Sequence, residues 1–370
     1  MRLNGSDRIR IKTLHGSFEF KEQRFLLPDG SCWRYLKRTG QGLVSSKLRE
    51  FCLYFSGRLS FAEVAKLLER VTGERLACEQ TLWNWAQEKA REVSASLCSE
   101  VAATRSMALP PIEEAVDVYD ASSEEVLVMS DAIQVKAQKP TREGAGEPKR
   151  GKKAKRVSTD LLLLEGKDGS FRCLSGALDG QVSLPEVARA HLGREWGKHP
   201  KPLPIVAITD GARQIRCMLE ELFGPSVRVI LDWYHLAKRA YQLLSMVAHD
   251  KAERERMEGR VLSLLWRGRA SEAISYLRGV KARREEALSS LVLYLENHAR
   301  EIVDYERRAK AGKTIGSGRM EKAVDLAVGI RQKKKGMSWT EAGSRALSLL
   351  KVVELNGEWE QLWKTTPAAA

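Results

Sequence analysis

Residues 204–235, PIVAITDGARQIRCMLEELFGPSVRVILDWYH, contain two short apolar runs on either side of an amphipathic segment. The runs PIVAI and VRVIL have no polar alternation, which indicates strands that are covered on both faces. The segment between them has helical periodicity and ends in glycine. The first run ends on Asp210, and we expect the second strand to continue through Asp232 to His235. This stretch therefore predicts a strand, a helix and a strand, with acidic residues where the strands end.

The same alternation continues on both sides of this unit. Residues 124–137, 160–166 and 170–178 predict three strands, and residues 184–196 predict a helix. From 236 to about 310 the chain has helical periodicity and no strand pattern. The order of three strands, helix, strand, helix and strand predicts an α/β fold, with a mixed sheet and a large all-α insertion.

The chain before the sheet has a short β region followed by helices. Residues 8–36 contain short β-type runs separated by turn residues, which predict a hairpin region to which we assign no function. Ser60 and Glu63 have the spacing of a capping box, and Gly73 ends that helix. A second helix begins near Cys78. Two helices joined by a short turn are typical of a DNA-binding helix-turn-helix, and an ordinary helical hairpin has a similar pattern.

The net charge favours a polyanionic partner. The sequence has 62 Lys plus Arg against 48 Asp plus Glu, a formal charge of +14, and a pI of about 9.5. Its six cysteines are far apart and form no Cys-x-x-Cys pair, which favours a reducing cytoplasm over a disulfide framework or a zinc site. We find no signal segment and no apolar run of about 18 residues, so we expect nucleic acid, and no membrane, as the partner.

Basic residues concentrate in two segments. Residues 136–156 contain nine Lys or Arg against two acids, and residues 307–335 contain ten against two. Such clusters give affinity for phosphates, and a solvated charged loop is the alternative. The start of the second helix in the helix-turn-helix is a further contact region. The predicted DNA-binding residues are Gln80, Thr81, Asn84, Lys149, Arg150, Lys152, Lys153, Lys155, Arg156, Arg319, Arg331, Lys333, Lys334 and Lys335.

Three carboxylates occur where polar side chains are least expected. Asp131 interrupts a strand pattern, Asp210 ends a buried strand, and Glu321 begins the helix after the turn Gly316-Ser317-Gly318. One such acid alone is usually paired or hydrogen-bonded, whereas acids brought together repel one another and call for a cation. Carboxylates suit Mg²⁺ or Mn²⁺, and two such ions promote in-line displacement at phosphorus. We also expect the N–H groups at the start of the Glu321 helix to bind a phosphate.

The segments around these acids resemble a known enzyme family. Residues 208–215 (ITDGARQI), 231–236 (LDWYHL) and 315–324 (IGSGRMEKAV) are similar to bacterial insertion-sequence transposases of the Kra and Lre types, which are related to the Mutator group. The resemblance covers roughly residues 115–363. It implies the RNase H-like core of DDE transposases, two Mg²⁺ or Mn²⁺ ions, cleavage at the ends of a mobile element, and strand transfer into target DNA. The implied partner is double-stranded DNA with terminal inverted repeats, bound by a homodimer or larger assembly in the cytoplasm at the nucleoid.

Carried onto this sequence, the resemblance implies Asp131, Asp210 and Glu321 as catalytic residues and metal ligands, with Asp232 and His235 as an auxiliary pair. We expect this pair to position the scissile phosphate or an unpaired nucleotide, and a purely structural hydrogen-bonding role for His235 is the alternative. Trp233, between them, is expected to stack on a base or to pack in the core. The family's first Asp is commonly followed by Gly, and here it is followed by Ala. The rival positions for this acid are Glu113, Glu114, Asp117 and Asp120.

The predicted divisions are 1–44, a small β-hairpin region; 45–108, a helix-turn-helix DNA-binding domain; 109–235, the first part of the RNase H-like core; 236–311, an all-α insertion; and 312–370, the helix with the catalytic Glu and the C-terminal helices. Two other functions remain open from the sequence. One is a DNA-binding regulator without catalysis, and the other is an RNase H-like nuclease without strand transfer.

Overall fold

The computed structural model describes residues 1–36, 43–139, 155–225 and 227–364. The strands are β1 (Arg2–Thr13), β2 (Gly16–Leu26), β3 (Cys32–Arg34), β4 (Leu43–Val44), β5 (Val126–Lys136), β6 (Arg156–Glu165), β7 (Phe171–Leu174), β8 (Ile205–Thr209) and β9 (Arg228–Leu231). The helices are α1 (Ser46–Ser56), α2 (Phe61–Thr72), α3 (Glu79–Thr104), α4 (Leu184–Trp196), α5 (Arg213–Phe223), α6 (Trp233–Val247), α7 (Lys251–Trp266), α8 (Ala270–Arg278), α9 (Glu285–Asn297), α10 (Tyr305–Lys310), α11 (Gly318–Val324), α12 (Ile330–Gln332), α13 (Glu341–Leu355) and α14 (Trp359–Lys364), with a 3-10 turn η1 (Leu178–Gly180) and a π-helical segment η2 (Asp325–Gly329).

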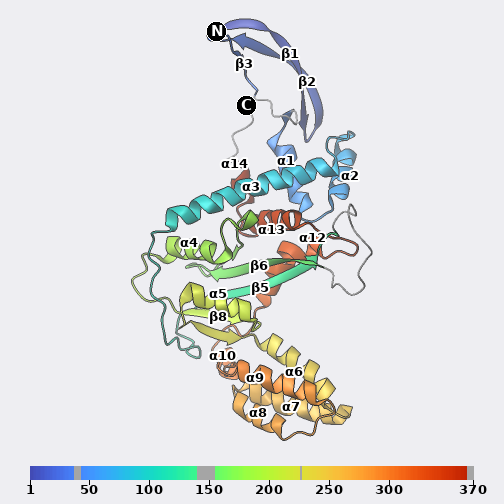
Figure 1. Ribbon diagram of the computed structural model, residues 1–370. Coiled ribbons are helices and arrows are strands. Elements are labelled where there is room, and N and C mark those ends of the chain that lie inside the picture. Colours follow the sequence, from blue (N-terminus) through green and yellow to red (C-terminus); the bar gives the residue numbers. More distant parts are fainter. Residues whose placement is uncertain (37–42, 140–154, 226, 365–370) are drawn as a thin grey trace, which may run out of the picture.

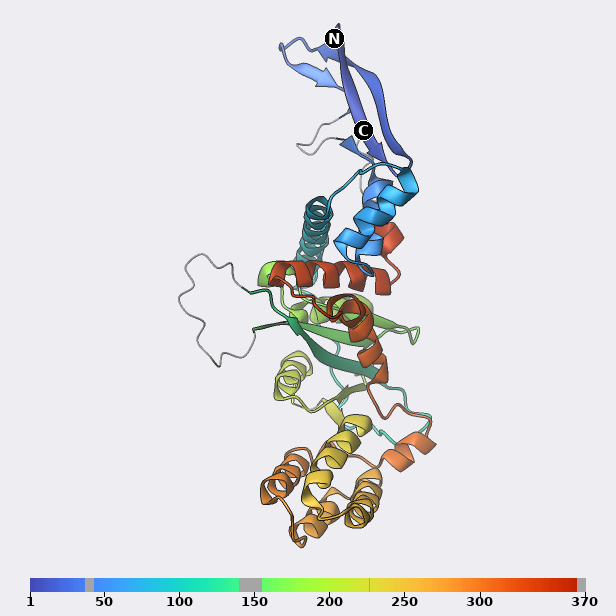
Figure 2. The ribbon, with the colours of Figure 1, turned by 90° about the vertical axis from the view of Figure 1, so that its right-hand side faces the viewer.

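A five-stranded mixed sheet forms the middle of an elongated molecule (Figures 1 and 2). Its strand order is β7-β6-β5-β8-β9. β5, β6 and β7 are antiparallel neighbours, whereas β8 is parallel to β5 and β9 is parallel to β8. The elements follow one another along the chain in the predicted order, and the predicted α/β fold is confirmed.

Helices cover both faces of this sheet. Alternate β5 residues such as Val126 and Val128 belong to a core shared with α4 and α5. The intervening residues, such as Leu127 and Met129, belong to the core on the other face, with α11 and α13. All five residues of β8 are buried. Coverage on both faces explains why the run PIVAI, which ends in β8, lacks polar alternation.

The last strand of the sheet is shorter than the sequence predicted. β9 ends at Leu231, and Trp233 and His235 already lie in the first turn of α6. The predicted extension of the strand to His235 is wrong, because the Asp232 side chain caps the helix and so ends the strand.

Between β9 and α11 the chain consists of helices α6 to α10, with α6, α7, α8 and α9 packed against one another. They lie at the end of the molecule opposite β1, β2 and β3 (Figure 1). Trp233 packs inside this insertion, with its ring centroid 4.8 Å from that of Trp266 and 5.1 Å from that of Tyr305. Of the two expectations for Trp233, the structure shows core packing.

The N-terminal part of the chain contains a four-stranded sheet of order β3-β2-β1-β4, and its hairpin already begins at Arg2. The capping box of Ser60 and Glu63 is present, and Gly73 ends α2 with a φ of 71°. α3 follows as a single long helix that packs along α13 and α4. Among the described residues, no helix combines the length and apolar composition needed to cross a bilayer.

Candidate active site

Three aspartates form a row across the parallel strands. Ile208 of β8 pairs with Met129 of β5, so Asp210 and Asp131, each two residues further on, occupy equivalent positions on neighbouring strands. Asp232 extends the row, since its backbone N–H donates to the carbonyl oxygen of the last residue of β8 at 2.8 Å. Parallel pairing therefore places the three aspartates side by side where the parallel pairing of β5, β8 and β9 ends.

Glu321 reaches this end of the strands from α11. Its Oε1 lies 3.6 Å from Nε2 of His235, and Nδ1 of His235 lies 3.5 Å from Oδ2 of Asp232. Burial raises the pKa of Asp131, and the charges of Asp210 and Glu321 raise it further. The structure thus brings together all five residues that the sequence singled out, from four separate segments of the chain.

Asp232 acts as an internal clamp. Its Oδ1 accepts the backbone N–H groups of Tyr234 at 2.6 Å and His235 at 3.0 Å, and its Oδ2 accepts both the backbone N–H and the hydroxyl of Ser317. The residue is 1% exposed. Burial opposes its ionisation, but hydrogen bonds from His235 and Ser317 outweigh burial and lower its pKa to about 2. This carboxylate faces protein donors, so its position supports a role in placing α11, and through it Glu321.

The Ser317 contact removes one donor from the expected phosphate site. The sequence predicted that N–H groups at the start of this helix would bind a phosphate, and the backbone N–H of Ser317, just before the helix, donates to Asp232 instead. Ser317 is itself buried. The turn before α11 therefore serves as an anchor, which the Gly-Ser-Gly pattern alone did not indicate.

His235 lies between two carboxylates and is about one-third exposed. The Asp232 carboxylate beside Nδ1 raises the pKa of His235, and the charge of Glu321 acts in the same direction. A protonated His235 can interact favourably with both acids.

Two glycines allow the close packing around the acids. Gly211, directly after Asp210, has a φ of +86°, and a Cβ there would lie 2.6 Å from Cε1 of His298. A Cβ on Gly316 would lie 2.5 Å from Cδ2 of Tyr234. Any residue with a Cβ would clash at these two positions, which explains why glycine occupies both.

A buried ion cluster joins the segment before β5 to the segment before α11. Arg308 is completely buried and donates through Nη1 and Nη2 to the two oxygens of Glu125, both at 2.8 Å. Nζ of Lys313 lies 3.0 Å from the same carboxylate. Arg308 and Lys313 belong to the basic segment 307–335 that was predicted to bind DNA. In the structure they instead stabilise the connection between the elements that carry Asp131 and Glu321.

The predicted DNA-binding residues fall into several environments. Lys149, Arg150, Lys152 and Lys153 lie outside the described residues. Lys155 and Arg156 are exposed at the start of β6, and Lys333 and Lys335 are exposed after α12.

Arg331 requires a correction. It is 3% exposed, its Nε donates to the carbonyl oxygen of Ser56 at 2.9 Å, and its guanidinium lies 4.7 Å from the ring centroid of Trp339. Burial lowers its pKa to about 10. Its neighbour Lys334 donates to the carbonyl oxygen of Arg58 at 3.1 Å. Arg331 therefore packs in the core and is not placed to contact DNA.

The remaining candidates lie at helix starts. Gln80 is exposed in the first turn of α3, and its Nε2 donates to Oδ1 of Asn84 at 3.0 Å. Thr81, beside them, is partly buried. In α11, the guanidinium of Arg319 lies 4.7 Å from the ring centroid of Phe171. Gln80 and Arg319 present polar groups at the surface, as a DNA contact requires.

The donor chemistry of the acidic site fits Mg²⁺ or Mn²⁺. Asp131, Asp210 and Glu321 supply hard carboxylate oxygens, and a cation would relieve the repulsion that raises the pKa of Asp131. One oxygen of each aspartate accepts a backbone N–H, from Ala132 at 2.7 Å and from Ala212 at 2.8 Å. Within the ranges that the structure describes, no three His, Cys, Asp or Glu side chains converge as a complete metal-binding group.

Comparisons with known proteins include a distant structural similarity. No protein-family model matches the chain, and no curated protein matches it. Among solved structures, the chain is similar to a Drosophila P element transposase strand transfer complex, with a TM-score of 0.28 and 9% sequence identity, over 89% of this chain and 82% of that chain. A similarity at this level is too low to assign a fold family or an activity.

Proposed function

We propose that the chain is a DNA transposase with an RNase H-like catalytic core, in which Asp131, Asp210 and Glu321 hold two Mg²⁺ or Mn²⁺ ions. The observation that carries this proposal is the placement of Asp131 and Asp210 two residues beyond a paired position of parallel β5 and β8, with the charges of Asp210 and Glu321 close enough to raise the pKa of Asp131 beyond the effect of burial. Three antiparallel strands followed by two parallel ones, with helices on both faces, provide the frame expected of such a core.

The ions, when bound, supply activation of the attacking oxygen and stabilisation of the leaving oxygen at a phosphodiester. The residues of the chain fix the geometry. Asp131 and Asp210 stand on neighbouring strands, where backbone amides orient one oxygen of each carboxylate. Glu321 is held through the contact between Asp232 and Ser317. In this proposal Asp131 and Asp210 are ligands held by the sheet, and Glu321 is a ligand held by an anchored helix.

His235 is proposed to hold a proton beside Glu321. Its Nε2 is 3.6 Å from the carboxylate, and its pKa is raised by Asp232. Positive charge on the imidazole offsets the negative charge of Glu321 when no cation is close. The role proposed for His235 is therefore to regulate the charge of the site, while Asp232 positions Glu321.

The proposed substrate is double-stranded DNA at the ends of a mobile element. The net charge of +14 and the exposed basic residues that flank β6 and α12 favour a polyanion. The exposed start of α3, with Gln80, is proposed to contact the terminal repeats. Because two ends must be cut together, we propose that a dimer or larger assembly acts on them.

The test is an assay of cleavage and strand joining on the DNA that flanks the gene, in Mg²⁺. We expect the unmodified protein to release 3′ ends and join them to target DNA, and Asp210→Asn to do neither. Asp250→Asn, at the exposed start of α7, is the matched control. Undiminished activity of Asp210→Asn would reject the site. DNA binding without cleavage would favour a regulator, and cleavage without joining would favour a nuclease.

A further inference from the structure

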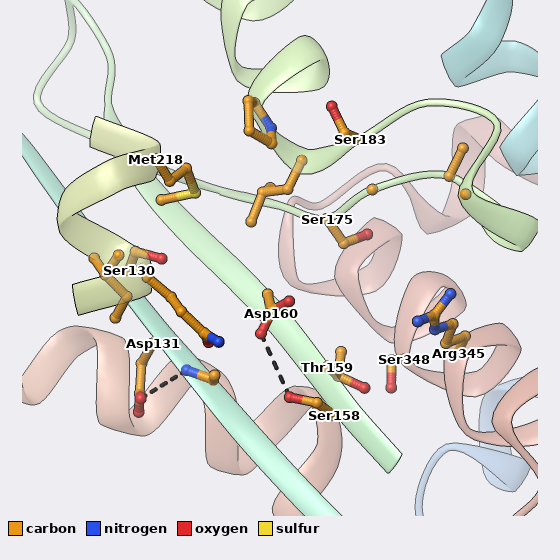
Figure 3. A pocket seen from close by; sticks show the side chains of 18 of the residues that line it. Ser130, Asp131, Ser158, Thr159, Asp160, Ser175, Ser183, Met218, Arg345 and Ser348 are labelled. Carbon is orange, nitrogen blue, oxygen red and sulfur yellow. Dashed lines mark hydrogen bonds between the residues drawn. The ribbon is translucent and has the colours of Figure 1, made fainter. Parts of the chain in front are cut away.

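The cavity beside the acidic site supplies little positive charge for a polyanion. Its volume is about 470 Å³, and its lining contains Asp131, Asp160 and Asp210 together with Arg345. Figure 3 shows Asp131 and Asp160 on neighbouring strands, with Arg345 on a helix to one side. Like charges repel, so the acids oppose the approach of phosphates when no cation is bound. Most of the affinity for DNA must therefore come from other surfaces of the chain.

The long hairpin of β1 and β2 offers such a surface, because it projects from the body of the molecule beyond α3 (Figures 1 and 2). β3 pairs with β2 at residues 24–26, and β4 pairs with β1 at residues 11–12. Between these pairings, residues 6–10 and 19–23 form a ribbon of two strands. Within the ribbon only Ile9 and Glu22 are buried. A two-stranded ribbon with so small a core is marginally stable by itself, so a bound partner would stabilise it.

One face of this ribbon carries unpaired positive charge. The register places Arg8 opposite Lys21 and Arg10 opposite Glu19 on this face, which we call the basic face. The side chains of Arg8 and Lys21 have no partner among the described residues. The six residues of the ribbon on the basic face are all exposed: Ser6, Arg8, Arg10, Glu19, Lys21 and Gln23.

The charged groups of the opposite face are engaged within the protein. Asp7 forms ion pairs with Arg24 at 3.4 Å and with Arg34 at 3.1 Å. Glu22 accepts the backbone N–H of Leu36 at 2.5 Å, so the chain after β3 reaches this face. The charges of the opposite face are thus balanced inside the protein, whereas those of the basic face are left for a partner.

The base of the basic face contacts the turn before α3. Lys12, which lies on this face, donates through Nζ to the carbonyl oxygen of Leu76 at 2.7 Å, and α3 begins three residues after Leu76. Nη2 of Arg10 lies 3.7 Å from the carboxylate of Glu74, and the hydroxyl of Ser17 donates to the same carboxylate. The basic face and the exposed start of α3 are therefore neighbouring surfaces.

We propose that the ribbon of β1 and β2 binds duplex DNA through its basic face, beside the segment that contacts the start of α3. The inference rests on the proposed function, which supplies DNA as the partner. A two-stranded ribbon fits the major groove, where side chains such as Arg8 and Gln23 can pair with base edges. From Lys12 to Leu3 the ribbon extends roughly 30 Å, at about 3.3 Å per residue, and one turn of the duplex is about 34 Å. The ribbon would therefore extend the contact made by α3 by nearly one turn.

The first experiment measures affinity as a function of salt. The full chain is titrated, without Mg²⁺, onto a fluorescent duplex of unrelated sequence, because phosphate contacts carry no sequence information. The double variant Arg8→Thr, Lys21→Thr keeps residues that favour strands. It should bind about tenfold more weakly and reduce the slope of log affinity against log salt by about 2.

Two further variants serve as controls. Glu19→Gln removes the acid of the basic face and should tighten binding about two- to threefold, a gain that misfolding cannot produce. Lys251→Ala removes a lysine that is 81% exposed on α7 and should bind normally. Equal affinity of the double variant and the unmodified chain would overturn the proposal, and so would a loss of the same size in Lys251→Ala.

The second experiment identifies what lies on each face of the ribbon. The photo-crosslinking residue p-benzoylphenylalanine replaces Ser6 on the basic face or Phe18, which is 51% exposed, on the opposite face. We expect the chain altered at Ser6 to crosslink to DNA and the chain altered at Phe18 not to do so. A crosslink from position 6 to a second copy of the chain, or a crosslink to DNA from position 18 alone, would overturn the proposal.

The two proposals fail separately. If cleavage requires Asp210 but the double variant binds DNA normally, the transposase proposal stands and the ribbon proposal falls. If the double variant loses affinity and position 6 crosslinks to DNA, but the unmodified chain cleaves no DNA in Mg²⁺, the ribbon proposal stands and the catalytic proposal falls.

Discussion

Replacing Asp232 with alanine removes a buried carboxylate that connects the start of α6 to the turn before α11. In the structure this side chain accepts hydrogen bonds from the backbone of Tyr234 and His235 and from both donors of Ser317. The variant therefore tests the clamp without changing any of the three proposed metal ligands. We expect a large loss of stability and a misplaced Glu321.

The size of the effect follows from these contacts. Loss of an N-cap residue costs about 0.5 to 2 kcal/mol. Loss of hydrogen bonds to a charged acceptor, with the Ser317 donors left buried, costs about 1.5 to 3 kcal/mol more. We therefore expect Asp232→Ala to lower the free energy of unfolding by about 2 to 5 kcal/mol.

The matched control is Asp250→Ala. Asp250 is an exposed N-cap of α7 whose side chain accepts one backbone N–H, from Glu253 at 2.8 Å, so its loss should cost about 1 kcal/mol. Urea unfolding followed by tryptophan fluorescence measures both variants. Adding Ser317→Ala to Asp232→Ala should cost little more, because the partner is already lost. An Asp232→Ala variant no less stable than Asp250→Ala would refute the clamp.

Three further outcomes are expected. The pKa of His235 should lie above 6.5 in an NMR titration and should fall towards 6.5 in Asp232→Asn. Protonated His235 should therefore stabilise the fold fully below pH 6.5, and this stabilisation should be lost as the pH rises through the raised pKa. A His235 pKa that does not change in Asp232→Asn would contradict the expectation. Gly316→Ala should lower the free energy of unfolding by about 1 to 3 kcal/mol, because the added methyl group meets the Tyr234 ring. In urea unfolding, adding Tyr234→Ala to Gly316→Ala should remove most of that loss. A double variant as unstable as Gly316→Ala would show that the clash lies elsewhere. Arg331→Ala should lower the free energy of unfolding by about 2 to 4 kcal/mol and leave the salt dependence of DNA binding unchanged, because the side chain is buried. Lys335→Ala should leave the free energy of unfolding nearly unchanged and reduce the salt dependence of DNA binding. A DNA-binding defect in Arg331→Ala alone would contradict the buried position of Arg331.

The parts of the fold that the sequence predicted depend on local patterns. The apolar runs and the periodic helices gave the order of strands and helices, and parallel pairing of neighbouring strands then brings Asp131 beside Asp210. The capping box at Ser60 and the glycine that ends α2 are likewise contained in a few residues. Such features need no knowledge of distant contacts.

The features that the sequence missed depend on contacts between distant residues. Asp232 and Ser317 are 85 residues apart, and Arg308 and Glu125 are 183 apart. Arg331 stands two residues before a run of three exposed lysines, but the turn of α12 directs Arg331 into the core. Composition marks such residues as charged, and only the packing shows whether the charge faces solvent, a buried partner or DNA.

The most direct test of the central claim is the rate of Mg²⁺-dependent DNA cleavage by the unmodified chain, by Glu321→Gln and by Glu360→Gln. Both glutamates are exposed in the first turn of a short helix, but Glu360 lies on α14, away from the proposed ligands. We predict that Glu321→Gln loses cleavage by more than about a hundredfold while Glu360→Gln cleaves normally. Equal rates in all three proteins would contradict the proposal that Asp131, Asp210 and Glu321 form one metal-dependent site.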